Sequence, residues 1–258
     1  MQLLLRFFAS PRLWIALAAW ATWTGLSAHA GEVQVAVAAN FAAPMQKIAT
    51  AFEKATGHRA VLSMGATGKF HAQIRNGAPF AVLLAADDET PARLVKEGLG
   101  VAGSTFTYAI GRLVLWSPRP DLVDPKGAVL DGPLPGKLAV ADPRLAPYGA
   151  ATLQVLNQRG LAGKLRPQMV TGESIGQTFQ FVKSGNALLG FVAMSQVMLD
   201  GRLVSGSAWL VPADLHEPIR QDAVLLKPGE NNPAAAALLQ YLRSDAARAV
   251  IRAHGYPF

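Results

Sequence analysis

One short segment, residues 172–176 with the letters GESIG, offers two kinds of chemistry. A strand-like pattern precedes it and a helical pattern follows it. The first N–H groups of a helix have no partner inside the helix and lie at the positive end of its dipole, so a turn of this kind can bind an anion. The same letters match the G-x-S-x-G motif of serine hydrolases, with Ser174 as the nucleophile. The rest of the chain must decide between the two interpretations.

The hydrolase interpretation needs an acid and then a histidine downstream of Ser174. The sequence offers two such pairs, Asp222 with His254 and Asp200 with His216. It offers no HGGG-like segment for an oxyanion hole, and the nucleophile would fall late, leaving little chain for the sheet beyond it. The anion-binding interpretation is therefore favoured. We expect no enzymatic activity and assign no catalytic residue.

Composition excludes several other classes of protein. The 258 residues include no Cys, which rules out disulfides, zinc–cysteine sites and cysteine nucleophiles. No H-E-x-x-H motif and no cluster of histidines with carboxylates is present, so we expect neither a metal nor an organic cofactor. The net charge of +7 comes from Lys and Arg scattered among Asp and Glu. Nucleic-acid binders usually show a basic stripe with interleaved aromatics, and none is visible here.

Residues 1–30 have the pattern of a secretory signal peptide. Two arginines precede an uncharged apolar run at 13–26, and the triplet Ala-His-Ala ends at Ala30. A charged start, a short apolar run and an A-x-A end predict cleavage after Ala30. The run is also short for a membrane-spanning helix, which needs about 20 apolar residues. We therefore expect a soluble mature protein, residues 31–258, in the periplasm.

Strand-like and helix-like patterns alternate along the mature chain, which predicts parallel sheets covered by helices on both faces. Strands are predicted at 33–38, 59–63, 80–85, 108–116, 137–141, 168–171, 188–193, 209–211 and 220–226. Helices are predicted at 41–56, 69–76, 91–97, 148–159, 175–183, 233–242 and 245–254. Asn40, Asn232 and Ser244 are predicted helix N-caps. The Pro-, Asp- and Gly-rich residues 118–135 are expected to form a surface loop.

Two sets of these elements are joined by long strands, which suggests two lobes. The chain is expected to cross between the lobes near 109–113 and again near 218–222. We assign 31–110 together with 222–258 to lobe 1, and 111–221 to lobe 2.

Several longer sequence segments resemble those of a known family. They are VAVAANF at 35–41, GATGK at 65–69, GAPFAVLLAAD at 77–87, YAIGRLVLWS at 108–117, ADPRLAPYG at 141–149, GESIGQTFQFVKSGNALLGFVAMSQ at 172–196, PIRQDAVLL at 218–226 and NPAAAALLQYL at 232–242. In this order and spacing the whole mature chain resembles the periplasmic molybdate-binding proteins of ABC transporters. The resemblance implies the type II periplasmic-binding-protein fold. In that α/β fold each of two lobes is a mostly parallel sheet flanked by helices, and the ligand cleft lies between the lobes.

The resemblance also implies a site for a tetrahedral oxyanion at turns that follow strands, where open α/β sheets bind their ligands. By position, Asn40 would donate from its backbone N–H and its side-chain amide, and Thr67 from its hydroxyl. Tyr148 and Ile175 would donate from backbone N–H groups, and Ala39 is a further candidate. Each position has a structural alternative: an N-cap for Asn40 and Thr67, a packed aromatic for Tyr148 and a buried contact for Ile175.

One position departs from the family pattern. Some members have a Tyr where this chain has Ala193, and its hydroxyl completes the anion shell. Asn40 is expected to supply the additional hydrogen bond, as in the branch of the family that has Asn there. Lys69 is expected to reach solvent rather than the anion, and Glu173 to point away from it.

The implied function is that of an extracytoplasmic binding protein. It would capture molybdate, or the nearly isosteric tungstate, close on it by hinge motion, and deliver it to an ABC permease in the inner membrane. We expect a monomer that does not bind nucleic acid. Two alternatives remain: the same fold with another oxyanion or small anion as its ligand, and a secreted serine hydrolase that uses Ser174.

Overall fold

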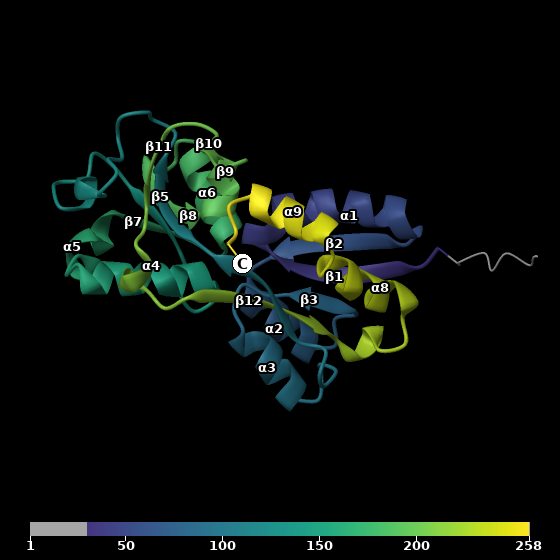
Figure 1. The fold of residues 1–258 in the computed structure, drawn as a ribbon. Coiled ribbons are helices and arrows are strands. Elements are labelled where there is room, and N and C mark those ends of the chain that lie inside the picture. The colour runs from purple at the N-terminus through teal and green to yellow at the C-terminus, as the bar shows by residue number, and fades with distance from the viewer. Residues whose placement is uncertain (1–29, 258) are drawn as a thin grey trace, which may run out of the picture.

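The computed structural model describes residues 30–257, so the predicted signal peptide, apart from its last residue, lies outside the described residues. The described residues form two five-stranded sheets and one two-stranded ladder. Figure 1 shows the two large sheets side by side, each flanked by helices, with the C-terminal end of the chain between them. The two-lobed α/β fold implied by the resemblance is thus the observed fold.

The first sheet has the strand order β2-β1-β3-β12-β4. Strand β1 is parallel to β2 and β3, whereas β12 is antiparallel to β3 and β4. The strands are β1 (Glu32–Ala38), β2 (Arg59–Gly65), β3 (Val82–Leu84), β4 (Phe106–Gly111) and β12 (Ile219–Leu225).

Helices cover both faces of this sheet because successive side chains of a strand point to opposite faces. Val35 and Val37 of β1 pack with α1, α8 and α9, whereas Ala36 packs with α2 and α3. The helices are α1 (Ala42–Thr56), α2 (Thr67–Arg75), α3 (Glu89–Lys96), α8 (Pro233–Leu242) and α9 (Asp245–Ala253).

The second sheet has the order β11-β5-β8-β6-β7. Strand β6 is parallel to β7 and β8, whereas β5 is antiparallel to β8 and β11. The strands are β5 (Leu113–Ser117), β6 (Leu138–Ala141), β7 (Met169–Gly172), β8 (Leu189–Ala193) and β11 (Ser207–Leu210). The two-stranded ladder joins β9 (Met198–Leu199) to β10 (Arg202–Leu203).

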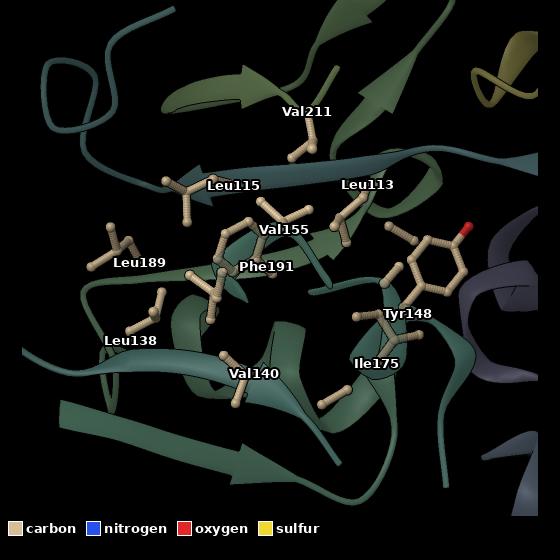
Figure 2. Packing of buried hydrophobic residues seen from close by; sticks show 14 of the residues in the cluster. Leu113, Leu115, Leu138, Val140, Tyr148, Val155, Ile175, Leu189, Phe191 and Val211 are labelled. Atoms are coloured by element: carbon tan, nitrogen blue, oxygen red, sulfur yellow. The ribbon is translucent and has the colours of Figure 1, made fainter. Parts of the chain in front are cut away.

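The core of the second half lies between this sheet and its helices. Figure 2 shows Leu113 and Leu115 of β5, with Phe191 of β8, packed around Val155 of α4. The helices are α4 (Pro147–Gln158), α5 (Ala162–Leu165), α6 (Ile175–Lys183) and α7 (Met194–Val197). Within residues 30–257, no helix combines the length and the apolar character needed to cross a membrane.

Each sheet is mostly parallel, as the resemblance implied: four strands run in one direction and one runs opposite, β12 in the first sheet and β5 in the second. The structure corrects two details of the sequence analysis. The single strand predicted at 108–116 is wrong: β4 and β5 are separate strands, interrupted at Arg112, and belong to different sheets. The pattern hid this break because both strands are largely buried. Asn40 is not the N-cap of α1, since residues Ala39–Phe41 form a 3-10 turn, labelled η1, before the helix begins.

Candidate functional site

Four chain turns follow strands of the two sheets, in pairs. The η1 turn follows β1 and α2 follows β2 in the first sheet, whereas α4 follows β6 and α6 follows β7 in the second. Each turn contains a predicted site residue, and η1 contains two, Ala39 and Asn40. Asn40, Thr67, Tyr148 and Ile175 are all at least 97% buried, and Ala39 is partly buried.

The turns from the two sheets meet. Ala38, at the end of β1, belongs to the same buried cluster as Tyr148 and Ile175 of the second sheet's helices, and Ala39 packs against that cluster. A Cβ added to Gly176 would lie 3.0 Å from the Cβ of Ala39. In Figure 2, Tyr148 and Ile175 lie at the same end of the cluster, and the Tyr148 hydroxyl points away from the packed side chains.

A backbone hydrogen bond joins the other two turns. The N–H of Gly68, in the first turn of α2, donates to the carbonyl of Leu145 before α4, at 3.0 Å. Thr67 itself is the first residue of α2 and not its N-cap. Its Oγ1 accepts from the N–H of Ala86 at 2.9 Å. A hydroxyl that accepts one bond keeps its own proton, so Thr67 can still donate to a ligand.

Helix geometry supplies the backbone donors of the second half. The N–H groups of Tyr148 and Ile175 fall in the first turns of α4 and α6, where they have no partner inside the helix. Pro147, the first residue of α4, has no N–H to offer. The ring of Tyr148 also packs in the core, and burial raises the pKa of its hydroxyl well above 10. The packed aromatic and the backbone donor are therefore compatible roles.

Asn40 is held by several polar contacts. Its Nδ2 donates to Oε1 of Gln221 at 2.9 Å and to the hydroxyl of Tyr256 at 3.0 Å. Its backbone carbonyl accepts from Oγ of Ser195 at 2.7 Å. Its Oδ1 is buried and has no hydrogen-bond partner among the described residues. In this orientation the amide nitrogen is directed at Gln221 and Tyr256, and the amide oxygen is the side-chain atom that has no protein partner among the described residues.

Ser174 has an ordinary structural role. It is the N-cap of α6, and its Oγ accepts from the N–H of Gln177 at 3.2 Å. The Gln177 side chain in turn accepts from the N–H of Glu173 at 2.7 Å. This pair of bonds resembles a capping box, except that Gln177 accepts from the residue before the N-cap and not from the N-cap itself. The histidines nominated for a triad, His216 and His254, each have Nδ1 within 2.8 Å of a backbone carbonyl close in sequence.

Two ion pairs lie close to these turns. Lys69, at the start of α2, forms an exposed ion pair with Glu173, before α6. Arg220 pairs with Asp88, Nε to Oδ2 at 3.5 Å. A groove of about 400 Å³ lies beside the turns, and its lining includes residues of both halves but none of the five predicted positions. In the part of the chain that the structure describes, no three His, Asp or Glu side chains are placed to hold a metal ion.

Three residues that contact Asn40 were not predicted from the sequence: Ser195, Gln221 and Tyr256. Gln221 carried a weak signal, because it is a polar residue inside a buried strand. Ser195 lies two residues after Ala193, and its hydroxyl donates to the backbone carbonyl of Asn40. Tyr256 carried no signal, since it lies beyond the last predicted helix.

Comparisons with known proteins identify the relatives of this chain. The family model described as "Bacterial extracellular solute-binding protein" matches residues 33–257. The molybdate-binding protein ModA of Azotobacter vinelandii is 57% identical over 249 residues, covering 96% of this chain and 98% of the relative. ModA of Rhodobacter capsulatus is 50% identical over 231 residues, covering 90% of each.

A solved structure also matches over most of the chain. The Azotobacter vinelandii periplasmic molybdate-binding protein superposes with a TM-score of 0.85 at 41% identity, covering 88% of this chain and 99% of that structure. The family model alone spans nearly all the described residues. The chain therefore belongs to the bacterial extracellular solute-binding proteins.

Proposed function

We propose that this chain is the molybdate-binding component of an ABC transporter. The observation that carries the proposal is the meeting of four turns whose predicted donors, at Asn40, Thr67, Tyr148 and Ile175, are buried and uncharged. Relatives at 57% and 50% identity are molybdate-binding proteins. A solute-binding protein of this family is not an enzyme, and Ser174 caps a helix.

Neutral donors suit a tetrahedral dianion. Helix N-termini place N–H groups and a positive dipole end toward the anion, so no buried cation is required. Fixed donors spaced for molybdate or tungstate would leave the smaller sulfate with stretched bonds, and each unmade buried hydrogen bond costs about 1–3 kcal/mol. Protonated phosphate would also need an acceptor, and this set of groups is rich in donors.

The anion would be enclosed by the closing of two lobes. We propose lobes of 31–110 with 222–258, and of 111–221; both boundaries fall inside strands that lead from one sheet toward the other, β4 and β12. Closure changes the outer surface as well as the cleft, which lets a permease distinguish loaded from empty receptor. We further propose a monomer in the periplasm, exported by a signal peptide cleaved after Ala30, with a permease of the inner membrane as its partner.

Thermal unfolding of the mature protein with molybdate, tungstate, sulfate and phosphate in turn tests the proposal. A ligand at about a thousand times its dissociation constant adds about 4 kcal/mol to the free energy of unfolding. For a chain of this length that raises the midpoint by about 8–16 °C. We expect this shift with molybdate and tungstate and little shift with sulfate or phosphate.

Each other result has a definite meaning. A shift with sulfate or phosphate alone would identify a protein of the same fold with a different oxyanion. No shift with any of the four anions would overturn the proposal. An assay with an esterase substrate, using Ser174→Ala as the matched variant, then decides the hydrolase alternative.

A further inference from the structure

A continuous chain of buried polar groups connects the proposed site to both halves of the molecule. Asn40 Nδ2 donates to Gln221 Oε1 at 2.9 Å, and Gln221 Nε2 donates to the Tyr148 hydroxyl at 3.0 Å. On its other side, Asn40 contacts the hydroxyl of Tyr256, which lies 2.9 Å from Oγ of Ser195. All five residues are at least 95% buried. Gln221 is the central link, because its amide touches two proposed ligand-binding residues.

One atom of this hydrogen-bonded network, Oδ1 of Asn40, is badly placed for an anion site. Oδ1 of Asn40 is buried without a hydrogen-bond partner, whereas Nδ2 has two. A buried acceptor without a donor costs about 1–3 kcal/mol. An amide oxygen directed toward a bound anion would also repel it. The orientation with Nδ2 toward Gln221 therefore cannot be the one that donates to the ligand.

The side-chain amides of Asn40 and Gln221 can each be rotated by half a turn, because amide oxygen and nitrogen have nearly the same shape. This rotation gives Asn40 Oδ1 a donor and removes the repulsion between Oδ1 and a bound anion. Gln221 Nε2 would then donate to Asn40 Oδ1, and the Tyr148 hydroxyl would donate to Gln221 Oε1. The Tyr256 hydroxyl, whose one proton is now within reach of the Asn40 backbone carbonyl at 3.0 Å and of Ser195 Oγ at 2.9 Å, would turn that proton to Asn40 Oδ1. Asn40 Nδ2 would occupy the place now held by Oδ1 and would point away from Gln221 and Tyr256. Only the nitrogen and oxygen of each amide exchange places, and the group of Asn40 that has no partner among the described residues becomes a donor.

We propose that Gln221 is a positioning residue that sets the orientation of the Asn40 amide, so that Asn40 presents a donor to the bound anion. This inference rests on the proposed function. Gln can serve because its amide both donates and accepts, as a link between a hydroxyl and a second amide requires. A side chain that can only accept would fix Asn40 in the opposite orientation, with oxygen toward the anion.

Gln221→Glu is the variant that tests this. An ionised Glu can only accept, so it holds Asn40 Nδ2 and leaves Oδ1 toward the anion. A protonated Glu donates from its O–H and accepts at its carbonyl, which reproduces the rotated Gln. Buried Glu residues can titrate as high as about pH 8–9. We expect molybdate affinity near that of the wild type at about pH 5.5 and a loss of about ten- to a hundredfold at about pH 9.

The surroundings of position 221 keep this pH dependence interpretable. The neighbouring titratable groups are the phenols of Tyr108, Tyr148 and Tyr256, with Asp222 next in β12 and Arg220 before it. Burial raises the pKa of Tyr256 to about 12, and those of the other two phenols well above 10. These phenols therefore stay neutral throughout the titration. The wild type, titrated in the same buffers, corrects for protonation of the anion itself and of Asp222.

Gln221→Met is the matched control, since it keeps the length of the side chain but neither donates nor accepts strongly. It should bind molybdate more weakly at every pH and show no pH dependence beyond that of the wild type. Isothermal titration calorimetry gives the affinities, and circular dichroism with thermal unfolding verifies the fold of each variant. Gln221→Glu that follows the wild type across the whole pH range would overturn the inference. A wild type that does not bind molybdate would instead overturn the proposed function on which it rests.

Neutron diffraction of the wild-type molybdate complex tests the same inference without any variant. Nitrogen with its deuterium atoms is distinguishable from oxygen by this method. We expect Nδ2 of Asn40 directed at the anion and Nε2 of Gln221 directed at Asn40 Oδ1. Finding Nδ2 of Asn40 directed at Gln221 in the loaded protein would refute the role of Gln221, even if both Gln221 variants failed to fold.

Discussion

The backbone of Gly111 lies directly against the side-chain hydroxyl of Tyr148. A Cβ atom added to Gly111 would be 2.5 Å from that oxygen and 2.6 Å from Nε2 of Gln221. Gly111 ends β4, where the chain leaves the first sheet for the second, and it pairs with Ile219 of β12. The absence of a side chain at this crossing is therefore what lets Tyr148 and Gln221 form their hydrogen bond.

Gly111→Ala should weaken ligand binding through this contact. Overpacking of a buried site costs about 1–3 kcal/mol, and here the strain falls on the hydrogen bond between Tyr148 and Gln221. We expect a lower unfolding midpoint and molybdate affinity reduced by about tenfold. Gly163→Ala is the control, because an added Cβ in α5 meets nothing within 4 Å. Calorimetry that finds equal affinity for Gly111→Ala and wild type would show that the crossing adjusts freely.

Thr67→Val should separate the contribution of the Thr67 hydroxyl to molybdate affinity from the contribution of the side chain's shape. Valine has nearly the same volume but cannot accept from the N–H of Ala86 or donate to an anion. The loss of one buried hydrogen bond to the ligand should reduce molybdate affinity by about five- to a hundredfold, with some loss of stability from the unpaired N–H. Thr67→Ser keeps the hydroxyl and should retain most of the affinity. If the Val and Ser variants bind equally well, Thr67 is a packing residue and not a ligand.

Local patterns predicted the elements well, and long-range contacts account for what they missed. The predicted helix 175–183 coincides with α6 because a capping serine and a regular apolar spacing mark its start and its face. The hydrogen bonds of Asn40 join residues 181 and 216 positions apart, to Gln221 and Tyr256. No local pattern encodes such a pairing, since it depends on how β12 and the C-terminal end return to the first sheet.

The candidate site was likewise predictable in part: its positions follow from the sequence, but the contacts around them depend on the fold. The sequence segments that resemble the family placed Asn40, Thr67, Tyr148 and Ile175 in four separate turns, and the fold brings these turns together. Their roles as ligands stay predictions. No local pattern indicates that the Asn40 amide is hydrogen-bonded on one side, because this depends on Gln221, Ser195 and Tyr256 around it.

The ion pair between Lys69 and Glu173 should modulate affinity only weakly. It joins α2 to the turn before α6, and both side chains are about half exposed or more. Exposed pairs contribute little and are screened by salt. Lys69→Met should therefore change molybdate affinity by less than about fivefold at low salt, and the difference should vanish at high salt.

The charge-reversed pair, Lys69→Glu with Glu173→Lys, is the control for this prediction. It should restore the low-salt affinity, because it rebuilds the same attraction with the charges exchanged. A loss of more than about tenfold in Lys69→Met that persists at high salt would instead place the ammonium group on the anion.

Asp222 should make the folded state less favourable as pH rises. Burial raises the pKa of Asp222 above its ordinary value of 3.8, and its Oδ1 has no hydrogen-bond partner among the described residues. A carboxyl whose pKa is higher in the folded state favours folding below its unfolded pKa, and this contribution is lost as pH rises through the folded pKa. At neutral pH the buried charge therefore lowers stability.

Asp222→Asn should remove this penalty while keeping the acceptor that Thr107 uses. Urea unfolding at a series of pH values should show the variant gaining stability relative to the wild type as pH rises from about 4 to about 7. Asp87 also has its pKa raised by burial, and Asp124 and Asp142 have theirs lowered by hydrogen bonds, so only the difference between variant and wild type isolates Asp222. A difference that stays constant with pH would mean that Asp222 titrates alike in the folded and unfolded states. A difference that shrinks as pH rises would mean that Arg220, on the same strand, stabilises the carboxylate more than burial opposes it.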